Sequence, residues 1–390
     1  MNFPEFQFKV SAKLRTRMLV LLGAGSGLAV LGAMLYPQRV WPNLLLLSFY
    51  LLTISLAGIV FVALQYVTGA HWAVALRRIP EAMGRLLPIG GAGLLLILLA
   101  HPALYSWTVH SAGGEPVPPF RQWWLSVPFF RLRAIGFLLL WALFSLALVR
   151  RSTQQDADAA PRHTRSNSRI SAIFVVLFAF SFWLASYDWI MSLEPRWYST
   201  IFASYNFAGL FLSGLAALTL MVVWLRQKSP LAAVITEDHL HDLGKLLFAF
   251  STFWMYLWFS QYMLIWYANI PEETTYFVQR LHGYWGSLFV LDMVLNWVGP
   301  FFALLPRRNK KDPGVLVKVC IVLLFGRWLD LYLMIMPTFS GTRPSIGVVE
   351  IATVVAGFGL FTLGILAVLR RAPLVPVNDP HLEESLHYHA

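Results

Sequence analysis

The sequence predicts an all-α polytopic membrane protein with about ten transmembrane helices. Of its 390 residues, 58% are hydrophobic and only 13% are charged, about half the charged fraction of an ordinary soluble domain. The apolar residues gather into long continuous runs, whereas a membrane β-barrel shows short alternating segments. Together these observations exclude a soluble enzyme, a disordered chain and a coiled coil.

Each predicted span is a run of roughly 20 mainly apolar residues, the length that an α-helix needs to cross a bilayer. The ten spans lie at approximately 18–36, 44–67, 86–107, 129–149, 170–191, 198–225, 243–268, 282–304, 315–337 and 349–370. They form a single membrane domain, 18–371, between an N-terminal segment, 1–17, and a C-terminal tail, 372–390. The longest connection, about 150–169, is polar, and we expect it to be mobile.

The distribution of basic residues predicts the orientation. With the N-terminus in the cytoplasm, 22 of the 30 Lys and Arg residues lie on inner segments and seven on outer segments. Positive residues accumulate on the cytoplasmic side of membrane proteins, so we expect both termini in the cytoplasm. The same basic connections explain the net charge of +11 through topology and contact with membrane lipids, so we do not expect a nucleic-acid partner.

The chain contains one cysteine, Cys320. A single thiol cannot hold an iron–sulfur cluster, and the sequence has no C-x-x-C-H motif for covalent haem. We therefore expect no metal in this chain. His381, His387 and His389 in the tail are a weaker metal candidate, and a solvated terminus is the preferred interpretation.

Four polar residues fall inside two consecutive predicted spans. Asp292 and Arg327 each lie twelve positions from the cytoplasmic end of their span, so we expect them to form an ion pair at equal depth. Asn296 follows Asp292 by four residues, and Asp330 follows Arg327 by three, which places each on its neighbour's helix face. Ionisable groups at bilayer depth usually mark a function. The cluster predicts a proton relay or a gate, and a static helix-pinning pair is the alternative.

Further polar residues lie nearer the membrane surfaces. Gln65 and His71 end the second span on the inner side, and Thr252 lies on the inner half of the seventh span. Gln261 lies on the outer half of the same span. Two water-filled half-channels would need polar groups at these positions, although Ser and Thr also bond to helix carbonyls in membranes. We treat these four residues as further candidates for a proton path.

A second cluster is expected near the outer surface. His101 lies toward the outer end of the third span, Arg131 at the outer start of the fourth, and Asp188 near the outer end of the fifth. A His and a carboxylate between apolar and aromatic walls suit a quinol head group, because each can bond one hydroxyl and take its proton on oxidation. An interfacial network that holds helix ends is the alternative interpretation.

Four segments resemble the NrfD/PsrC-like membrane subunits, and among them the ActF-type subunits of alternative complex III, a bacterial quinol:electron-acceptor oxidoreductase. The two longest are 188–195 (DWIMSLEP) and 260–274 (SQYMLIWYANIPEET). The others are 71–78 (HWAVALRR) and 239–246 (HLHDLGKL). The resemblance covers nearly the whole chain.

The resemblance implies two four-helix bundles, 44–191 and 198–337, with one flanking helix on each side. It also implies a bacterial inner-membrane location, an ActC-like sister subunit, and periplasmic multihaem cytochrome and iron–sulfur subunits that carry the haem and clusters. Quinone, such as menaquinone, and proton translocation belong to this functional context. The family's quinol site uses a His and an acid near the outer surface, which His101 and Asp188 match by position. A passive anchor for the redox subunits is the main alternative, and a secondary transporter is a third.

Overall fold

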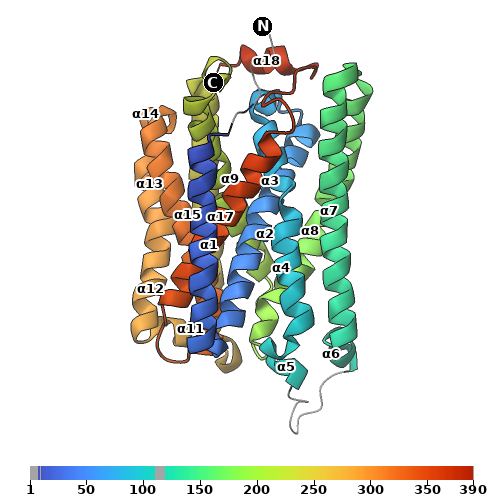
Figure 1. The fold of residues 1–390 in the computed structure, drawn as a ribbon. Coiled ribbons are helices and arrows are strands. Elements are labelled where there is room, and N and C mark those ends of the chain that lie inside the picture. The colour runs from blue at the N-terminus through green and yellow to red at the C-terminus, as the bar shows by residue number, and fades with distance from the viewer. Residues whose placement is uncertain (1–7, 9, 110–118, 390) are drawn as a thin grey trace.

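The computed structural model describes residues 8, 10–109 and 119–389, and this part of the chain is helical with no β-strand. The helices run mostly along one direction (Figure 1). Their bounds are α1 (Ala12–Leu35), α2 (Pro37–Thr68), η2 (His71–Leu76), α3 (Arg78–Gly84), α4 (Leu87–Ala100), α5 (Ser106–Val109), α6 (Pro119–Trp124), α7 (Val127–Asp158), α8 (Arg162–Trp189), α9 (Phe202–Lys228), α10 (Glu237–Ala268), α11 (Pro271–Leu281), α12 (Tyr284–Met293), the π-helical segment η6 (Val294–Val298), α13 (Gly299–Leu304), α14 (Arg307–Lys311), α15 (Pro313–Ile335), α16 (Pro337–Ser340), α17 (Val348–Leu369) and α18 (Leu382–Leu386).

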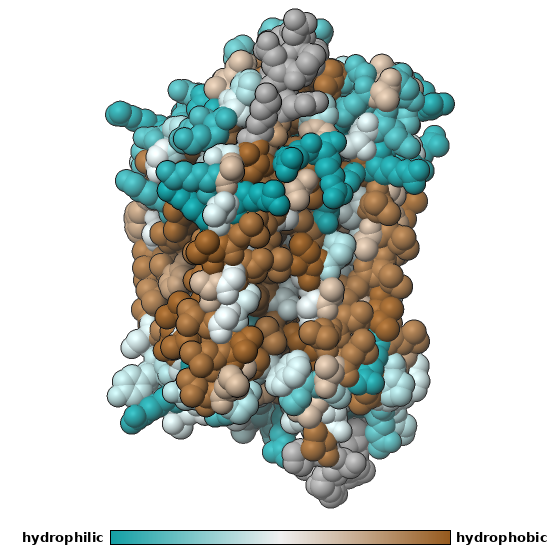
Figure 2. All heavy atoms as spheres, viewed as in Figure 1, coloured by the Kyte–Doolittle hydropathy of each residue, from teal (hydrophilic) through white to brown (hydrophobic). Residues whose placement is uncertain are grey.

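Eight helical stretches in the described residues are long and apolar enough to cross a membrane. They are α1, α2, α3–α4, α7, α8, α9, α12–α13 and α17. The other two predicted spans correspond to α10 and α15, long helices that lie among these eight. Helix α15 is apolar apart from three charged residues, Lys318, Arg327 and Asp330. Figure 2 shows a brown apolar belt between two more polar ends. The chain is thus an all-α polytopic membrane protein, as predicted.

Helices α2 and α9 form the centre of the molecule. Helix α2 packs against α4, α8 and α9, and α9 in turn packs against α10 and α15. Helix α1 lies at the periphery along α17. Small residues allow that approach, since a Cβ on Gly25 would lie 2.6 Å from the backbone nitrogen of Ala356.

Helix α18 and the first turn of α1 lie at one end of the molecule, and α11 lies at the other (Figure 1). We call these the α18 end and the α11 end. Part of the predicted N-terminal segment, 1–7 and Lys9, lies outside the described residues.

The connection at 150–169 is not the mobile loop that its polarity predicted. Helix α7 continues to Asp158 and α8 starts at Arg162, which leaves a three-residue turn. The amide of Gln155 donates to the Thr164 hydroxyl at 2.8 Å, and Arg162 pairs with Asp158 at 2.9 Å. Polar helix extensions that bond to one another need no lipid contact, so both helices continue beyond their apolar segments.

The C-terminal tail is also more ordered than expected, because it docks on the α18 end. Asp379 pairs with Arg77 at 2.5 Å. The Ser385 hydroxyl donates to the Trp72 carbonyl at 2.6 Å, and the Tyr388 hydroxyl donates to Asp242 at 2.6 Å. The expectation of a solvated terminus is therefore wrong for Asp379 and Ser385, which are buried, whereas His387 and His389 are exposed.

Candidate functional site

The centre of the candidate site is a buried ion pair in α15. Arg327 donates to Asp330, one helical turn further along. The guanidinium also donates to the side-chain oxygen of Asn206 in α9. Asp330 accepts from the Tyr205 hydroxyl and, at 3.3 Å, from the indole nitrogen of Trp254 in α10. Three helices thus supply the partners that two charges need away from water.

Asp292 and Asn296 lie beside this pair on the broken helix α12–η6. The Asn296 amide donates to the Asp292 carboxylate at 2.8 Å. The segment from Val294 to Val298 is π-helical, a conformation that is frequent at functional sites. The Ser251 hydroxyl of α10 donates to the Asn296 carbonyl at 2.6 Å and so binds a carbonyl in this irregular stretch. We call Asp292, Asn296, Arg327 and Asp330 the central cluster; each is about 1% exposed.

Two glycines make room for the central cluster. A Cβ on Gly209 of α9 would lie 2.3 Å from a guanidinium nitrogen of Arg327. A Cβ on Gly326 would lie 2.7 Å from the side-chain oxygen of Asn296. Any larger residue at either position would push the polar side chain away, so the local sequence is shaped around these two groups.

A small cavity touches the cluster on the side of the α11 end. It measures about 20 Å³, room for about one water molecule, and both Asp292 and Asp330 line it. Gln261 of α10 and Arg280 of α11 also line it. The Arg280 guanidinium pairs with Glu194 at 2.6 Å, and Glu194 is partly exposed at the α11 end. A polar route therefore leads from the two buried carboxyl groups toward that surface.

The structure differs from the sequence prediction in the partner of Arg327. We expected an ion pair with Asp292, but the guanidinium binds Asp330. The i, i+3 spacing on one helix face brings Asp330 into reach without help from another helix. Asp292 is held by Asn296 instead, and none of the ion pairs found among the described residues includes Asp292.

Not all the proton-path candidates from the sequence lie near the central cluster. Gln261 lines the cavity and is buried. Thr252 is exposed and bonds to the Phe248 carbonyl of its own helix, whereas its neighbour Ser251 faces the cluster. Gln65 lies near the α18 end of α2, with its side-chain oxygen buried and without a hydrogen-bond partner among the described residues.

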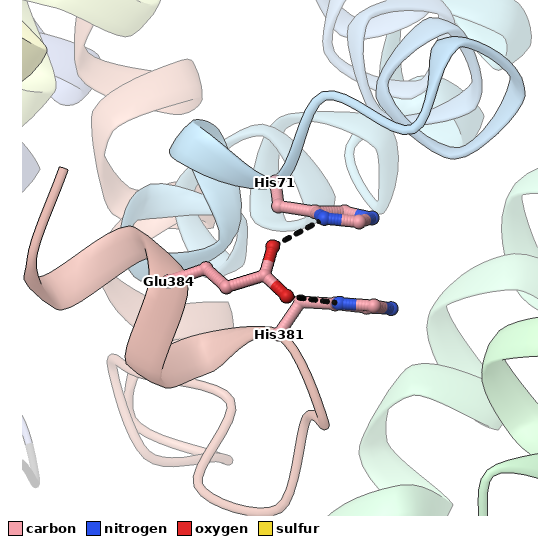
Figure 3. Close-up of side chains that lie close together, drawn as sticks. All are labelled: His71, His381 and Glu384. Carbon is pink, nitrogen blue, oxygen red and sulfur yellow. Dashed lines mark hydrogen bonds and ion pairs between the residues drawn. The ribbon is translucent and has the colours of Figure 1, made fainter.

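His71 belongs to a separate group at the α18 end, with His381 and Glu384 (Figure 3). The two imidazole rings stack with centroids 3.5 Å apart and planes 12° apart. Their Nδ1 atoms lie 2.6 and 3.2 Å from the two oxygens of Glu384. These hydrogen bonds, first from His381 and then from His71, lower the pKa of Glu384 below its ordinary value.

These three side chains are the group of His and acidic residues in the described structure that comes closest to a metal site, with ligand atoms within 4.8 Å of one another. Parallel rings direct their nitrogens along parallel lines, not toward one point. The carboxylate already bridges both nitrogens. The arrangement links the tail to η2, and we call His71, His381 and Glu384 the latch.

A second contact of the tail joins Tyr388 to α10. The hydrogen bond to Asp242 raises the pKa of Tyr388 to about 12.

The three quinone-binding candidates have different partners. Asp188 binds Arg133 through both carboxylate oxygens, at 2.7 and 2.9 Å, and accepts from Trp124 at 3.1 Å. Arg131 donates to the carbonyls of residues 98 and 99 at the end of α4. His101 stacks on Trp41, with ring centroids 4.8 Å apart. Each of the three residues thus contacts a different partner near a helix end, and the structure does not bring them together in one site.

Sequence reasoning missed several residues of these sites. Asn206 and Tyr205 lie in a predicted apolar span. An Asn within such a span indicates a buried polar site as clearly at 206 as at 296. Arg280 lies in an amphipathic helix that hydropathy assigns to a loop. Arg133 was visible, but nothing in the spacing separates it from Arg131, since both lie at the start of α7.

The fold and the central cluster define a class: a polytopic helical membrane protein with a buried acid–base group reached from one surface by a polar route. Comparison with known proteins carries the assignment no further, because no protein-family model matches the chain and no curated protein is significantly similar to it.

Proposed function

We propose that this chain is an inner-membrane subunit of a bacterial respiratory quinol:electron-acceptor oxidoreductase and carries part of a proton path. The resemblance to ActF-type NrfD/PsrC-like subunits supports this proposal, with both termini in the cytoplasm. An ActC-like sister and periplasmic multihaem and iron–sulfur subunits would be its partners. Haem and clusters would be held by those partners.

The observation that carries the proposal is the charge balance around the cavity. Three carboxyl groups, Glu194, Asp292 and Asp330, face two guanidinium groups, Arg280 and Arg327. Arg280 pairs with Glu194, and Arg327 pairs with Asp330. One carboxyl group, that of Asp292, is left without an ion-pair partner among the described residues, although it is only about 1% exposed. Burying the charged form of an isolated carboxyl group costs several kcal/mol. Asp292 is therefore favoured in its protonated form, and the site holds one exchangeable proton.

The hydrogen-bonding residues define how that proton moves. Asp292 and Asp330 line the same cavity, which has room for one water between them and Gln261. From there, Arg280 and Glu194 continue the polar route to the α11 end. A proton on Asp292 therefore exchanges with the α11 side in this conformation.

The opposite direction is closed. One turn from Ser251 toward the α18 end lies Leu247, and one turn from Arg327 in that direction lies Leu323; both are fully buried. Access to the cytoplasmic side thus needs a movement, and the π-helical segment at Asn296 is the part of the wall with irregular hydrogen bonding. A redox-driven shift of this segment would switch the side to which Asp292 is open.

The quinone-binding candidates do not fit a quinol site in this conformation. Both oxygens of Asp188 are taken by Arg133, and Arg131 is engaged by helix-end carbonyls. We therefore derive no quinol step from His101, Asp188 and Arg131, and the proposal places quinol oxidation with a partner subunit.

The test is the proton-to-electron stoichiometry of the intact complex in vesicles. Asp292→Asn removes the proton site but keeps the hydrogen bond from Asn296, so assembly should persist while the stoichiometry falls. Glu272→Gln, an exposed acid at the start of α11, is the matched control and should change nothing. An assembled Asp292→Asn complex with unchanged stoichiometry would show that the chain is a passive anchor.

A further inference from the structure

A second polar pocket lies at the α18 end, at a different place in the molecule from the central cluster. It has a volume of about 330 Å³ and lies between α3, the last turns of α7 and the end of α17. Its walls are part charged and part apolar. The charged side chains are Arg78, Glu81, Arg85, Asp156 and Arg371.

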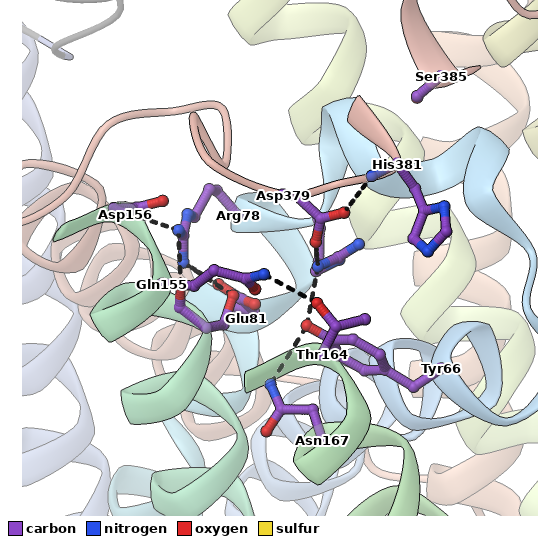
Figure 4. A network of polar contacts seen from close by, with 12 residues as sticks. Tyr66, Arg78, Glu81, Gln155, Asp156, Thr164, Asn167, Asp379, His381 and Ser385 are labelled. Carbon is purple, nitrogen blue, oxygen red and sulfur yellow. Dashed lines mark hydrogen bonds and ion pairs between the residues drawn. The ribbon is translucent and has the colours of Figure 1, made fainter. Parts of the chain in front are cut away.

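One wall is an acidic group built around a buried arginine (Figure 4). Arg78 pairs with Glu81 at 2.8 Å and with Asp156 at 2.5 Å. Each of the two carboxylates has a second oxygen that is buried and has no hydrogen-bond donor in the described structure. Glu81 is only 2% exposed. A buried acceptor without a donor is costly, so this wall is suited to a ligand that carries N–H or O–H groups.

Basic side chains also line the pocket. Arg85 and Arg371 line the pocket and form no ion pair with an acid among those found in the described residues. Arg78 is outnumbered by its two carboxylates, which leaves one negative charge around it, while Arg85 and Arg371 add two positive charges to the same lining. The pocket therefore offers both signs of charge, which matches a ligand with an ammonium group and a phosphate group close together.

The position of the pocket fits a lipid. Apolar groups of Val149 and Leu369 complete its lining. Below Val149 on α7, Leu146, Leu143 and Leu139 are more than half exposed and follow one face of the helix toward the bilayer centre. Figure 2 shows the brown apolar belt directly below the teal α18 end. Basic pockets between helices at this level bind lipid head groups.

We propose that this pocket binds the head group of a zwitterionic aminophospholipid of the inner leaflet. Its phosphate lies on Arg85 and Arg371, and its primary ammonium donates to Glu81 and Asp156. The acyl chains extend along the exposed leucines of α7. The bound lipid then joins α3, α7 and α17 at a point where α3–α4, the third membrane-crossing stretch, begins.

Native mass spectrometry of the delipidated full chain in detergent tests the proposal. The probes are phosphatidylethanolamine, phosphatidylcholine, phosphatidylglycerol and soluble phosphoethanolamine. Phosphatidylcholine keeps the phosphate but has no N–H donor, and phosphatidylglycerol has no ammonium. We expect phosphatidylethanolamine to bind about tenfold more tightly than either. Weak binding of phosphoethanolamine alone would show that the acyl chains contribute, whereas binding equal to that of the lipid would contradict a lipid site.

Two sets of variants locate the binding. Arg85→Gln and Arg371→Gln should each weaken phosphatidylethanolamine and phosphatidylcholine alike, because they remove a phosphate contact. Glu81→Gln and Asp156→Asn should each reduce or abolish the preference for phosphatidylethanolamine over phosphatidylcholine, because each removes an acceptor for the ammonium group. Thermal melting checks that both variants fold. Arg370→Gln is the control, since Arg370 is exposed beside Arg371 but does not line the pocket. Equal affinity for all three lipids, or equal effects of Arg370→Gln and Arg371→Gln, would overturn the proposal.

Discussion

Arg327 and Asp330 form an ion pair one helical turn apart in α15, and both are about 1% exposed. Neither charge is in contact with lipid or bulk water. Asn206, Tyr205 and Trp254 from two other helices complete their hydrogen bonds. The pair therefore fixes the positions of α9, α10 and α15 relative to one another, and it leaves Asp292 as the carboxyl group without a cation.

Removing both members of this pair should cost less than the sum of the two single removals. We expect Arg327→Leu to lower the stability by roughly 3–5 kcal/mol, because Asp330 is left as an unpaired buried charge. Arg327→Leu combined with Asp330→Leu should lose less than the sum of the single variants by at least about 1 kcal/mol. Thermal melting in detergent micelles measures both effects. Additive losses would mean that the two side chains do not interact.

The glycines beside the cluster give a second prediction. Gly209→Ala places a methyl group 2.3 Å from the Arg327 guanidinium, and such overpacking costs about 1–3 kcal/mol. Gly136→Ala in α7 is the control, because a Cβ there meets nothing within 4 Å. Melting temperatures of the two variants should differ accordingly. Equal stability would indicate that Arg327 has room to move.

The latch at the α18 end should open in acid. Glu384 has a lowered pKa in the docked tail, so its contribution is present above the ordinary value of 4.5 and is lost as the pH falls through the lowered pKa. The protection of residues 376–389 against hydrogen exchange, relative to the intrinsic rate at each pH, should therefore fall as the pH drops below 4.5 through the lowered pKa. Glu384→Gln should show faster exchange already at neutral pH, while Glu383→Gln, its exposed neighbour, should behave like the wild type. A protection factor that changes neither with pH nor in Glu384→Gln would contradict the latch.

The Asp188–Arg133 pair predicts a contrast between two arginines on α7. Arg133→Gln strands a buried carboxylate and should cost roughly 3–5 kcal/mol. Arg131→Gln removes hydrogen bonds to helix-end carbonyls at a half-buried position and should cost roughly 1 kcal/mol. The stability of both variants can be compared by thermal melting. Equal losses would show that Arg131 has a larger role than its contacts indicate.

Hydropathy was sufficient to predict the class of fold, because a bilayer requires long apolar helices and their lengths are fixed by its thickness. It was not sufficient for the ends of the helices. The extension of α7 to Asp158 and the docking of the tail depend on single contacts, such as Arg78 with Asp156 and Arg77 with Asp379. Arg77 and Asp379 are 302 positions apart, so no local sequence pattern predicts such a pair.

The candidate site shows the same limit. Depth along a helix predicted that Asp292, Asn296, Arg327 and Asp330 belong together, and the structure places all four side by side. Depth says nothing about rotation around the helix axis, however. For that reason the sequence predicted Asp292 as the partner of Arg327, where the structure has Asp330. For the same reason it grouped His101 with Asp188, although their side chains face different neighbours.

The central claim is that Asp292 holds an exchangeable proton. Infrared difference spectroscopy of the chain in lipid, in H₂O and in D₂O, tests it most directly. The account predicts a protonated carboxyl C=O band that shifts in D₂O and is absent in Asp292→Asn, but is retained in Glu272→Gln. A band that is missing in the wild type, or one that survives in Asp292→Asn, would contradict it.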